Sequence, residues 1–177
     1  MLLAVLMLAA CTSKPAAGKQ DPAASEVSFT QEMETESHEL LTLLDSLNCS
    51  CVVRNNGITT RYIQRGVRDL YELVSTRPEV LRGAHVADKI IGKGAAALLV
   101  LGKASRATTH TITTPALKML REAGMEVRYG NEVPYVENWK KTGQCPLDAR
   151  LQEVDSVHLC LPVIRQFIQD LDDGKVF

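Results

Sequence analysis

Several features that mark common protein classes are scarce in this sequence of 177 residues. Aromatic residues make up only 5%, which leaves few side chains on which nucleic-acid bases could stack. Lysine and arginine number 20 against 21 aspartates and glutamates, so no basic excess attracts a phosphate backbone. No apolar run reaches the roughly 18 residues of a membrane span. We therefore expect neither a nucleic-acid partner nor a membrane-spanning helix.

The composition that remains is that of an ordinary globular protein. Hydrophobic residues make up 45% of the chain and charged residues 23%, a balance that supports a buried core and excludes general disorder. The length suits one compact domain with a short extension, and no internal repeat occurs.

The first eleven residues have the pattern of a bacterial lipoprotein signal. The unbroken apolar run from Leu2 to Ala10 has the length of a signal-peptide core and is too short to cross a bilayer. The four residues Leu-Ala-Ala-Cys that end at Cys11 resemble a lipobox, although no lysine or arginine precedes the run. Residues 1–11 are therefore predicted to be the signal peptide and Cys11 the lipidation site. The alternative is a buried apolar strand followed by an unrelated cysteine.

This signal predicts the location and the domain boundaries of the protein. Lipid on Cys11 would anchor the chain to a membrane of the bacterial cell envelope, facing the periplasm. Residues 12–35 are rich in Ser, Pro, Ala and charged side chains, which predicts a flexible linker. Residues 36–177 are then predicted to form the folded domain.

Hydrophobic periodicity divides residues 36–177 into alternating helices and strands. The order predicts an α/β fold in which helices cover both faces of a mixed sheet, giving three layers, α/β/α. Asn55-Asn56-Gly57 predicts a tight hairpin, because Asn and Gly tolerate positive φ. The predicted elements are helix 36–47, strands 49–54 and 58–63, helices 67–74 and 84–101, strand 108–113, helix 114–123, strand 125–129, a second short strand at 133–136, and helices from Pro146 onward.

The longest apolar stretch of the domain, residues 84–101, is predicted to be one buried helix because of its length and its alanines. Gly92 and Gly94 would each cost about 1 kcal/mol relative to alanine in a helix. We therefore expect them to mark a close approach to another backbone, such as that of a sheet. Helix starts at 84–88 and 113–116 would then lie at the carboxyl ends of strands, where ligands bind in such folds.

Several short motifs occur in an order typical of one known family. The sequence GAHVADKIIGKGAA at 83–96 is the longest of them. Over about residues 38–155 these motifs resemble the family called domain of unknown function 1893, although Gly94 stands where that family usually has alanine. The resemblance implies a cytidine deaminase-like fold and no assigned reaction. The other motifs are SCVV at 50–53, RGVRDL at 65–70, YG at 129–130, VPY at 133–135 and CP at 145–146.

The residues do not support the zinc chemistry of cytidine deaminases. Those enzymes bind zinc through one His or Cys and two Cys, and a nearby Glu transfers protons. Here His85 is followed by Val, Ala and Asp88 in place of His-x-Glu, and no cysteine follows Pro115 at the second predicted helix start. No Cys-x-x-Cys occurs in the chain. We therefore predict no metal site, no zinc-dependent deamination and no resident cofactor.

Polar residues near the two predicted helix starts are the candidates for ligand binding. On a helix, Lys89 and Lys93 would share a face at i, i+4 spacing, with Asp88 beside them. Thr113 and Thr114 would approach from the opposing turn. Free N–H groups at helix starts, together with lysines, suit an anion or a carbonyl oxygen. These five residues predict a small polar or anionic ligand, whereas the plain alternative is a solvated helix start.

The cysteines beyond Cys11 have several roles open to them. Cys145 is included among the candidate ligand-binding residues, because its thiol could act as a nucleophile. A disulfide with Cys160 in an oxidising periplasm is an alternative. Cys49 and Cys51 are roughly 6–7 Å apart along one strand face, too far for an easy disulfide, and are expected to be small buried hydrophobic residues.

Two functions of different kinds fit these observations. The first is an envelope protein with a metal-independent pocket for a small polar ligand, with or without catalysis. The second is a non-catalytic protein-interaction module tethered to the membrane by lipid. An open polar pocket would favour the first function, and a filled apolar one the second. The sequence indicates neither a catalytic residue nor an oligomeric state.

Overall fold

The structure, a computed structural model, describes residues 22–138 and 140–176. The chain divides into two compact units, residues 1–33 and residues 34–177. The described part of the first unit is the beginning of helix α1 (Pro22–Ser46), and all other elements belong to the second. The predicted signal peptide and Cys11 lie outside the described residues, so both stay predictions.

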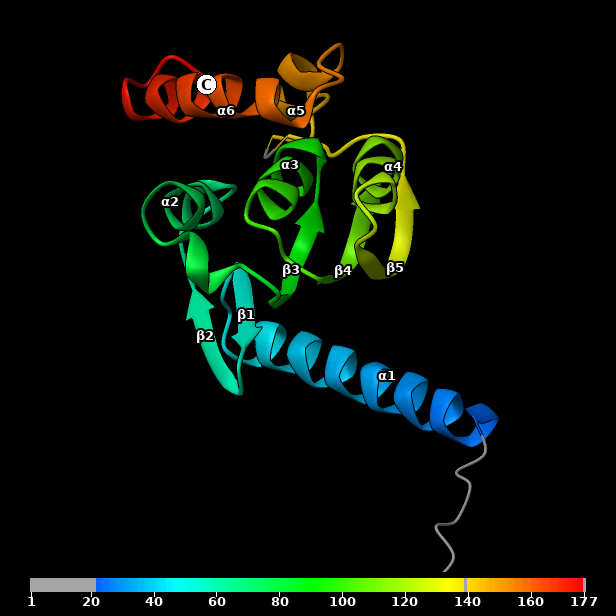
Figure 1. Ribbon diagram of the computed structural model, residues 1–177. Helices are drawn as coiled ribbons and strands as arrows, with labels where there is room; N and C mark the ends of the chain where they lie inside the picture. The colour runs from blue at the N-terminus through cyan, green and yellow to red at the C-terminus, as the bar shows by residue number, and fades with distance from the viewer. Residues whose placement is uncertain (1–21, 139, 177) are drawn as a thin grey trace, which may run out of the picture. The chain divides into compact units, whose positions relative to one another are not determined.

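Five strands form one mixed sheet in the second unit, in the order β2-β1-β3-β4-β5 (Figure 1). The central strand β3 is antiparallel to β1 and parallel to β4, which is itself parallel to β5. The predicted hairpin joins β1 to β2 and is confirmed, with φ of 49° at Asn56 and 76° at Gly57. The strands are β1 (Cys51–Asn55), β2 (Ile58–Tyr62), β3 (His85–Ile91), β4 (Arg106–Thr113) and β5 (Glu126–Val133).

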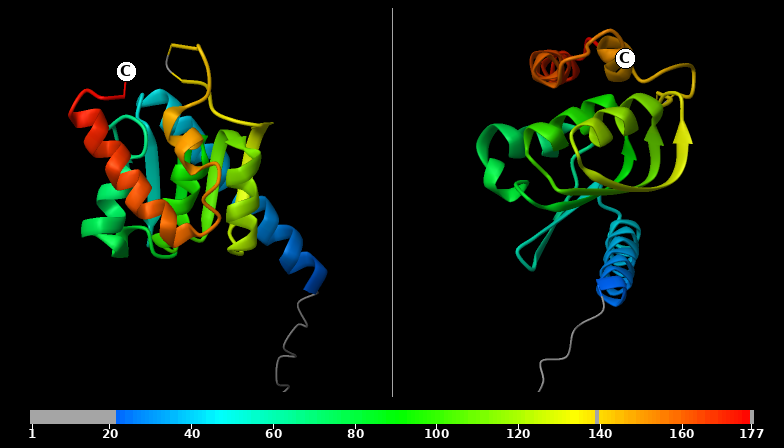
Figure 2. Two further views of the ribbon diagram at one scale, coloured as in Figure 1. Left: turned by 90° about the horizontal axis from the view of Figure 1, so that it is seen from above. Right: turned by 45° about the vertical axis from the view of Figure 1, so that its right-hand side comes forward.

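Helices cover both faces of this sheet, which confirms the predicted α/β class. Helices α2 (Arg68–Thr76), α3 (Lys93–Leu101) and α4 (Thr114–Glu122) cover one face, and the part of α1 from Glu34 onward covers the other (Figures 1 and 2). A short 3-10 helix, Pro78–Val80, follows α2. Two further helices, α5 (Pro146–Leu151) and α6 (Val157–Asp172), pack on the outer side of α3 (Figure 2).

The predicted helix over 84–101 is wrong in its first half. His85–Ile91 form the central strand β3, and α3 begins only at Lys93. A strand buried on both faces has a continuous apolar run, so periodicity alone cannot distinguish it from a buried helix. The predicted helix start at 84–88 therefore does not exist, and β3 reaches the helix through Gly92.

Two other boundaries differ from the prediction. Helix α1 begins at Pro22, inside the segment 12–35 predicted to be a flexible linker. That segment contains Ala, Glu, Gln and Met, which favour helix even where no apolar stripe marks one. At the other end of the domain, β5 ends at Val133, and no separate strand forms at 133–136.

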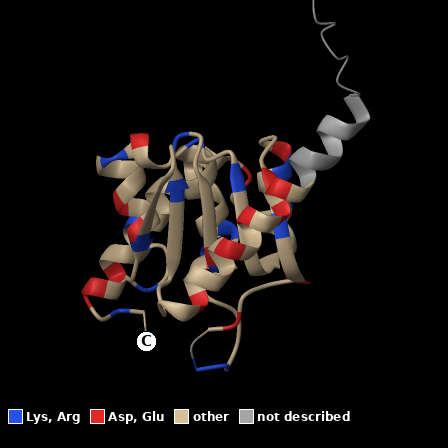
Figure 3. Ribbon diagram, turned by 90° about the horizontal axis from the view of Figure 1, so that it is seen from below, with Lys and Arg blue, Asp and Glu red and all other residues tan. Residues whose placement is uncertain are grey.

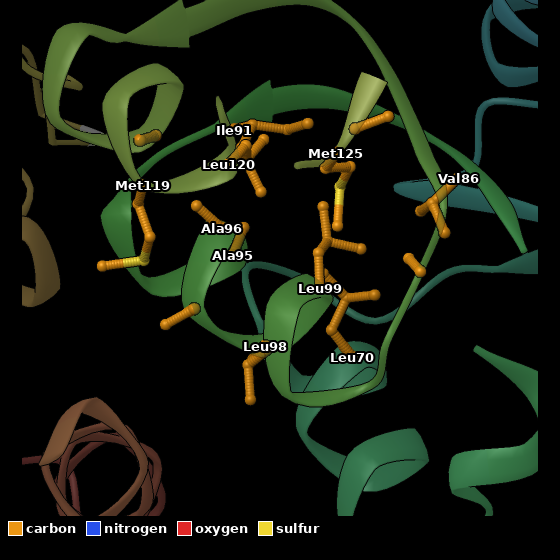
Figure 4. Packing of buried hydrophobic residues seen from close by; sticks show 14 of the residues in the cluster. Leu70, Val86, Ile91, Ala95, Ala96, Leu98, Leu99, Met119, Leu120 and Met125 are labelled. Carbon is orange, nitrogen blue, oxygen red and sulfur yellow. The ribbon is translucent and has the colours of Figure 1, made fainter. Parts of the chain in front are cut away.

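The larger hydrophobic core lies between the sheet and helices α2, α3 and α4, and α3 is its most buried element. Every residue of α3 from Lys93 to Leu99 is buried. Leu98 and Leu99 are fully enclosed, and Figure 4 shows Leu99 directed toward Met125 while Leu98 points away from the strands. Each such leucine contributes about 1.5–3 kcal/mol by leaving water. The core therefore fixes the position of α3 and of the site at its N-terminus.

Candidate functional site

A cleft of about 170 Å³ lies at the N-terminus of α3. Strands β3 and β4 are parallel and lead into α3 and α4, so both helices begin at the same edge of the sheet. The loop after β5 and helix α5 close the cleft. Its lining residues are Lys93, Pro115, Pro134, Tyr135, Gln144, Asp148 and Gln152.

The carboxylate of Asp148 occupies the N-terminus of α3. The backbone N–H of Lys93 donates to Oδ1 of Asp148 at 3.1 Å, and the N–H groups of Gly94 and Val136 also hydrogen-bond this side chain. Burial raises the pKa of Asp148, while these N–H donors act in the opposite direction. The expected free N–H groups are therefore already engaged, and an external anion would have to displace Asp148 to reach them.

The two glycines at the start of α3 are explained by this contact. A Cβ at Gly92 would lie 2.7 Å from Oδ1 of Asp148, and one at Gly94 would lie 2.6 Å from Cδ2 of Leu147. A close approach was expected at both positions. The neighbour, however, is a pair of side chains of α5 and not the backbone of the sheet.

The side chain of Lys93 carries the one positive charge that lines the cleft. The residue is only 9% exposed, and its ammonium group donates to the carbonyl oxygen of Gln152 at 3.2 Å. No carboxylate oxygen among the described residues lies within 4.0 Å of this ammonium group. A buried ammonium group is costly to desolvate unless oxygen atoms surround it, so this position favours an additional oxygen ligand.

The two threonines predicted to bind ligand lie at the start of α4. Thr113 is buried, and its hydroxyl oxygen accepts the N–H of Ala116 at 3.3 Å, which confirms the predicted cap of this helix. The hydroxyl of Thr114 donates to Oε1 of Glu132 at 2.7 Å. Both side chains therefore already have protein partners, and neither lines the cleft.

Asp88 and Lys89 lie on strand β3 and not on a helix, so the predicted shared face with Lys93 is wrong. Neighbouring residues of a strand point to opposite faces of the sheet. Lys89 lies on the face covered by α1, where its ammonium group donates to Asn48 at 3.4 Å. Oδ1 of Asp88 accepts the N–H of Ile90 at 3.1 Å, and burial raises the pKa of Asp88 to about 7. Neither residue lines the cleft.

Cys145 lies directly before α5 and is half-buried. Burial raises the pKa of its thiol, which leaves it protonated at neutral pH and weakens it as a nucleophile. Cys145 and Cys160 are both free thiols, so the alternative of a disulfide between them is not found. Cys49 and Cys51 are buried, as expected.

A comparison with known families decides the classification. The model of the family described as "Domain of unknown function (DUF1893)" matches residues 39–168. The chain belongs to the DUF1893 family. A solved structure of a DUF1893 family protein (TM1506) from Thermotoga maritima has a TM-score of 0.67 and 24% sequence identity, covering 73% of this chain and 87% of the other. This likeness shows a shared fold, and no curated protein matches the chain.

Four residues of the DUF1893 cleft were not predicted from the sequence. Asp148 could have been recognised as an acidic residue in the first turn of a helix that begins with Pro146, but no local pattern shows that it caps α3. Tyr135 belongs to the VPY motif and Gln144 directly precedes the CP motif, but neither motif indicates a binding role, and Gln152 lies in no motif. Lys93 is the one predicted ligand-binding residue that the cleft contains.

Among residues 22–138 and 140–176, no group of three His, Cys, Asp or Glu side chains is placed to hold a metal ion. None of the helices described is both long enough and apolar enough to cross a membrane.

Proposed function

We propose that this DUF1893 domain binds a small polar ligand in the cleft, through an anionic or carbonyl oxygen that contacts Lys93. The observation that supports this most strongly is the environment of Lys93, a 9% exposed residue whose ammonium group donates to a backbone carbonyl and has no carboxylate oxygen within 4.0 Å among the described residues. An anionic or carbonyl oxygen of a ligand would give this ammonium group a second close oxygen contact.

The other cleft residues narrow the chemistry of this ligand. Asp148 places a carboxyl group in the same cleft, so a ligand with several negative charges would be repelled. A ligand with one anionic or carbonyl oxygen and at least one N–H or O–H donor fits both charged groups. Tyr135, Gln144 and Gln152 add polar groups around them.

Replacing Lys93 with methionine is expected to weaken this binding about tenfold or more, because the variant keeps the aliphatic stem but loses the charge. Small molecules that remain with the natively purified protein would be identified by mass spectrometry and then titrated into each variant by calorimetry. Lys103→Met changes an exposed lysine outside the cleft and serves as the control. Equal retention by Lys93→Met and the wild type, or a wild type that retains and binds nothing, would rule the proposal out.

We also infer that the fold is a relative of the cytidine deaminase-like fold that works without zinc. The cleft lies between two helix starts, and Pro115 opens α4 without the cysteines that would follow it in a deaminase. The charge of Lys93 would then take the place of a metal in polarising a ligand oxygen. This part of the proposal predicts that chelators leave ligand binding unchanged.

Cys11 is proposed to carry lipid that tethers the domain to the cell envelope. We expect the wild-type protein to sediment with bacterial membranes and a Cys11→Ser variant to become soluble or to remain an unprocessed precursor, because acyl chains supply the anchor. Cell fractionation and the intact mass of the N-terminal peptide measure both effects. Cys145→Ser is the control and should stay membrane-bound. A soluble wild-type protein, or an unmodified cysteine, would contradict the tether.

A further inference from the structure

A row of charged side chains crosses the sheet beneath helix α1. Arg54 of β1, His85 of β3, Arg106 of β4 and Glu126 of β5 are partners in the strand register, so they lie side by side on four neighbouring strands. Figure 3, which shows the sheet from below, has the acidic positions of α1 passing over strands that carry basic residues. A histidine therefore stands between two arginines.

One glutamate of α1 lies over the centre of this row. Oε2 of Glu36 is 2.6 Å from Nη1 of Arg106 and 3.3 Å from Nδ1 of His85, and Oε1 is 3.8 Å from Nη1 of Arg54. Arg54 also binds Glu39, one turn further along the helix, at 3.0 Å. The row and the helix are thus joined mainly by opposite charges.

His85 is almost fully buried at this junction, with 2% of its surface exposed. Its Nε2 is 2.6 Å from the hydroxyl of Thr108, which in turn is 3.2 Å from the hydroxyl of Ser37 on α1. Nδ1 is close to Glu36 but has no hydrogen-bond partner of suitable geometry within the described chain. The imidazole is therefore buried, and one of its two ring nitrogens has no hydrogen bond to a described residue. The strength of the contact between His85 and α1 thus depends on whether the imidazole is protonated.

The apolar part of the same contact is small. From Glu34 to Ser46, only Leu40 and Leu44 of α1 are fully buried, against Val52 and Ala87 of the sheet. These two leucines supply about 3–6 kcal/mol and the partly buried Leu41 and Leu43 add to this, but the ordering of a helical segment largely offsets the gain. The charged junction at Glu36 therefore has a large share in holding this segment in place.

We propose that residues 34–46 of α1 form a pH-sensitive clasp on the sheet, which loosens under mild acid when His85 becomes protonated. Protonation would add a third positive charge between those of Arg54 and Arg106. Of the two carboxylates of α1 at this row, Glu36 and Glu39, only Glu36 lies close to His85. Like charges on directly paired strand residues repel each other. The helix is the element that can move away, because the strands are held by the sheet.

As the pH falls, the titration of His85 and the titration of Glu36 both destabilise the docked form of α1. Burial lowers the pKa of His85, and Arg106 adds to this effect, while Glu36 and Glu126 oppose it. A histidine with a lowered folded-state pKa stabilises the docked form above its ordinary pKa, near 6.5, and loses that contribution as the pH falls below it.

At lower pH, protonation of Glu36 causes a second loss of docking stability. Burial opposes its ionisation, but His85, Arg106 and Arg54 outweigh burial and lower the pKa of its carboxyl group below 4.5. Its contribution is present above pH 4.5 and disappears as the pH falls through the lowered value. The clasp is therefore closed at neutral pH and weakens first below about pH 6.5.

Hydrogen exchange measured by mass spectrometry on the full purified protein tests this proposal. Protection factors, corrected for the intrinsic effect of pH on exchange, are compared at pH 7.5 and pH 5.5 for peptides from residues 36–46 and from α3. Helices in proteins owe most of their stability to packing, so a released segment exchanges faster. We expect protection of residues 36–46 to fall severalfold at the lower pH, up to the roughly tenfold that one histidine titrating near pH 6.5 can supply, and that of α3 to change less than about twofold.

Three variants separate the clasp from general acid sensitivity. His85→Gln cannot be protonated and should reduce the pH effect to less than about twofold. Glu36→Gln removes the central carboxylate and should leave residues 36–46 weakly protected at both pH values. His110→Gln is the matched control, because His110 also pairs with α1, at 3.0 Å from Asp45, but is exposed; it should keep the wild-type response.

The same measurements can overturn the proposal. The proposal is wrong if the protection of residues 36–46 in the wild type is the same at both pH values. It is also wrong if α3 loses as much protection at pH 5.5 as residues 36–46 do. An undiminished pH response in a folded His85→Gln variant would also contradict it. If His85→Gln does not fold, Glu36→Gln decides, because strong protection of residues 36–46 in that variant would exclude the clasp.

Discussion

Replacing Asp148 with alanine is expected to lower the free energy of unfolding by about 1–3 kcal/mol, because buried N–H groups at the start of α3 lose their acceptor. The N–H of Lys93 is 3.1 Å from this carboxylate, and Gly94 and Val136 also donate to it. Asp148 is only 7% exposed, so its carboxylate shields these N–H groups from water in the wild-type protein. Urea unfolding followed by circular dichroism measures the loss.

Two further variants define the cause of that loss. Asp148→Asn keeps one acceptor oxygen and should remain within about 1 kcal/mol of the wild type. Asp155→Ala removes an exposed carboxylate of the same part of the chain and should change stability by less than about 0.5 kcal/mol. If Asp148→Ala unfolds at the wild-type urea concentration, the carboxylate does not stabilise α3.

The truncation of Leu99 to alanine should have the largest effect on stability, about 2–5 kcal/mol. Leu99 is fully buried in the main core, within the close-packed group shown in Figure 4. The loss combines the transfer of the leucine atoms out of the core with the cavity that they leave. Thermal unfolding should show a midpoint lower by roughly 5–15 °C.

Leu159→Ala provides the comparison for this result. Leu159 belongs to helix α6 but is 62% exposed, so its removal should cost less than about 0.5 kcal/mol. Similar losses for the two variants would mean that burial around α3 does not control the stability of the domain. A Leu99→Ala variant with an unchanged melting temperature would contradict the described core directly.

Much of the fold could be predicted from local sequence patterns. The hairpin at Asn56 and Gly57 and the threonine cap before Pro115 depend on residue preferences that act within one turn, and the structure confirms both. The central strand β3 was missed, because its apolar run continues through Gly92 into an equally apolar helix. Only the tertiary setting, with one strand on each side, distinguishes the two states.

The candidate site was less predictable because its contacts are long-range. Lys93 was identified from its position near a helix start, although the helix begins later than expected. Asp148 was not identified, because its role depends on how α5 packs against α3. The same limit applies to Glu36 and His85. Their contact joins helix α1 to strand β3, and hydrophobic periodicity within one element does not predict a polar contact between two elements.

The cap that Asp148 provides for α3 comes from 55 residues further along the chain. During synthesis, α3 and the strands on either side of it leave the ribosome well before this carboxylate is available. Until Asp148 has been made, the first backbone N–H groups of α3 can therefore be hydrogen-bonded only by water. A stalled chain that ends before Pro146 should consequently remain open at this edge, and the cleft can close only after α5 has been made.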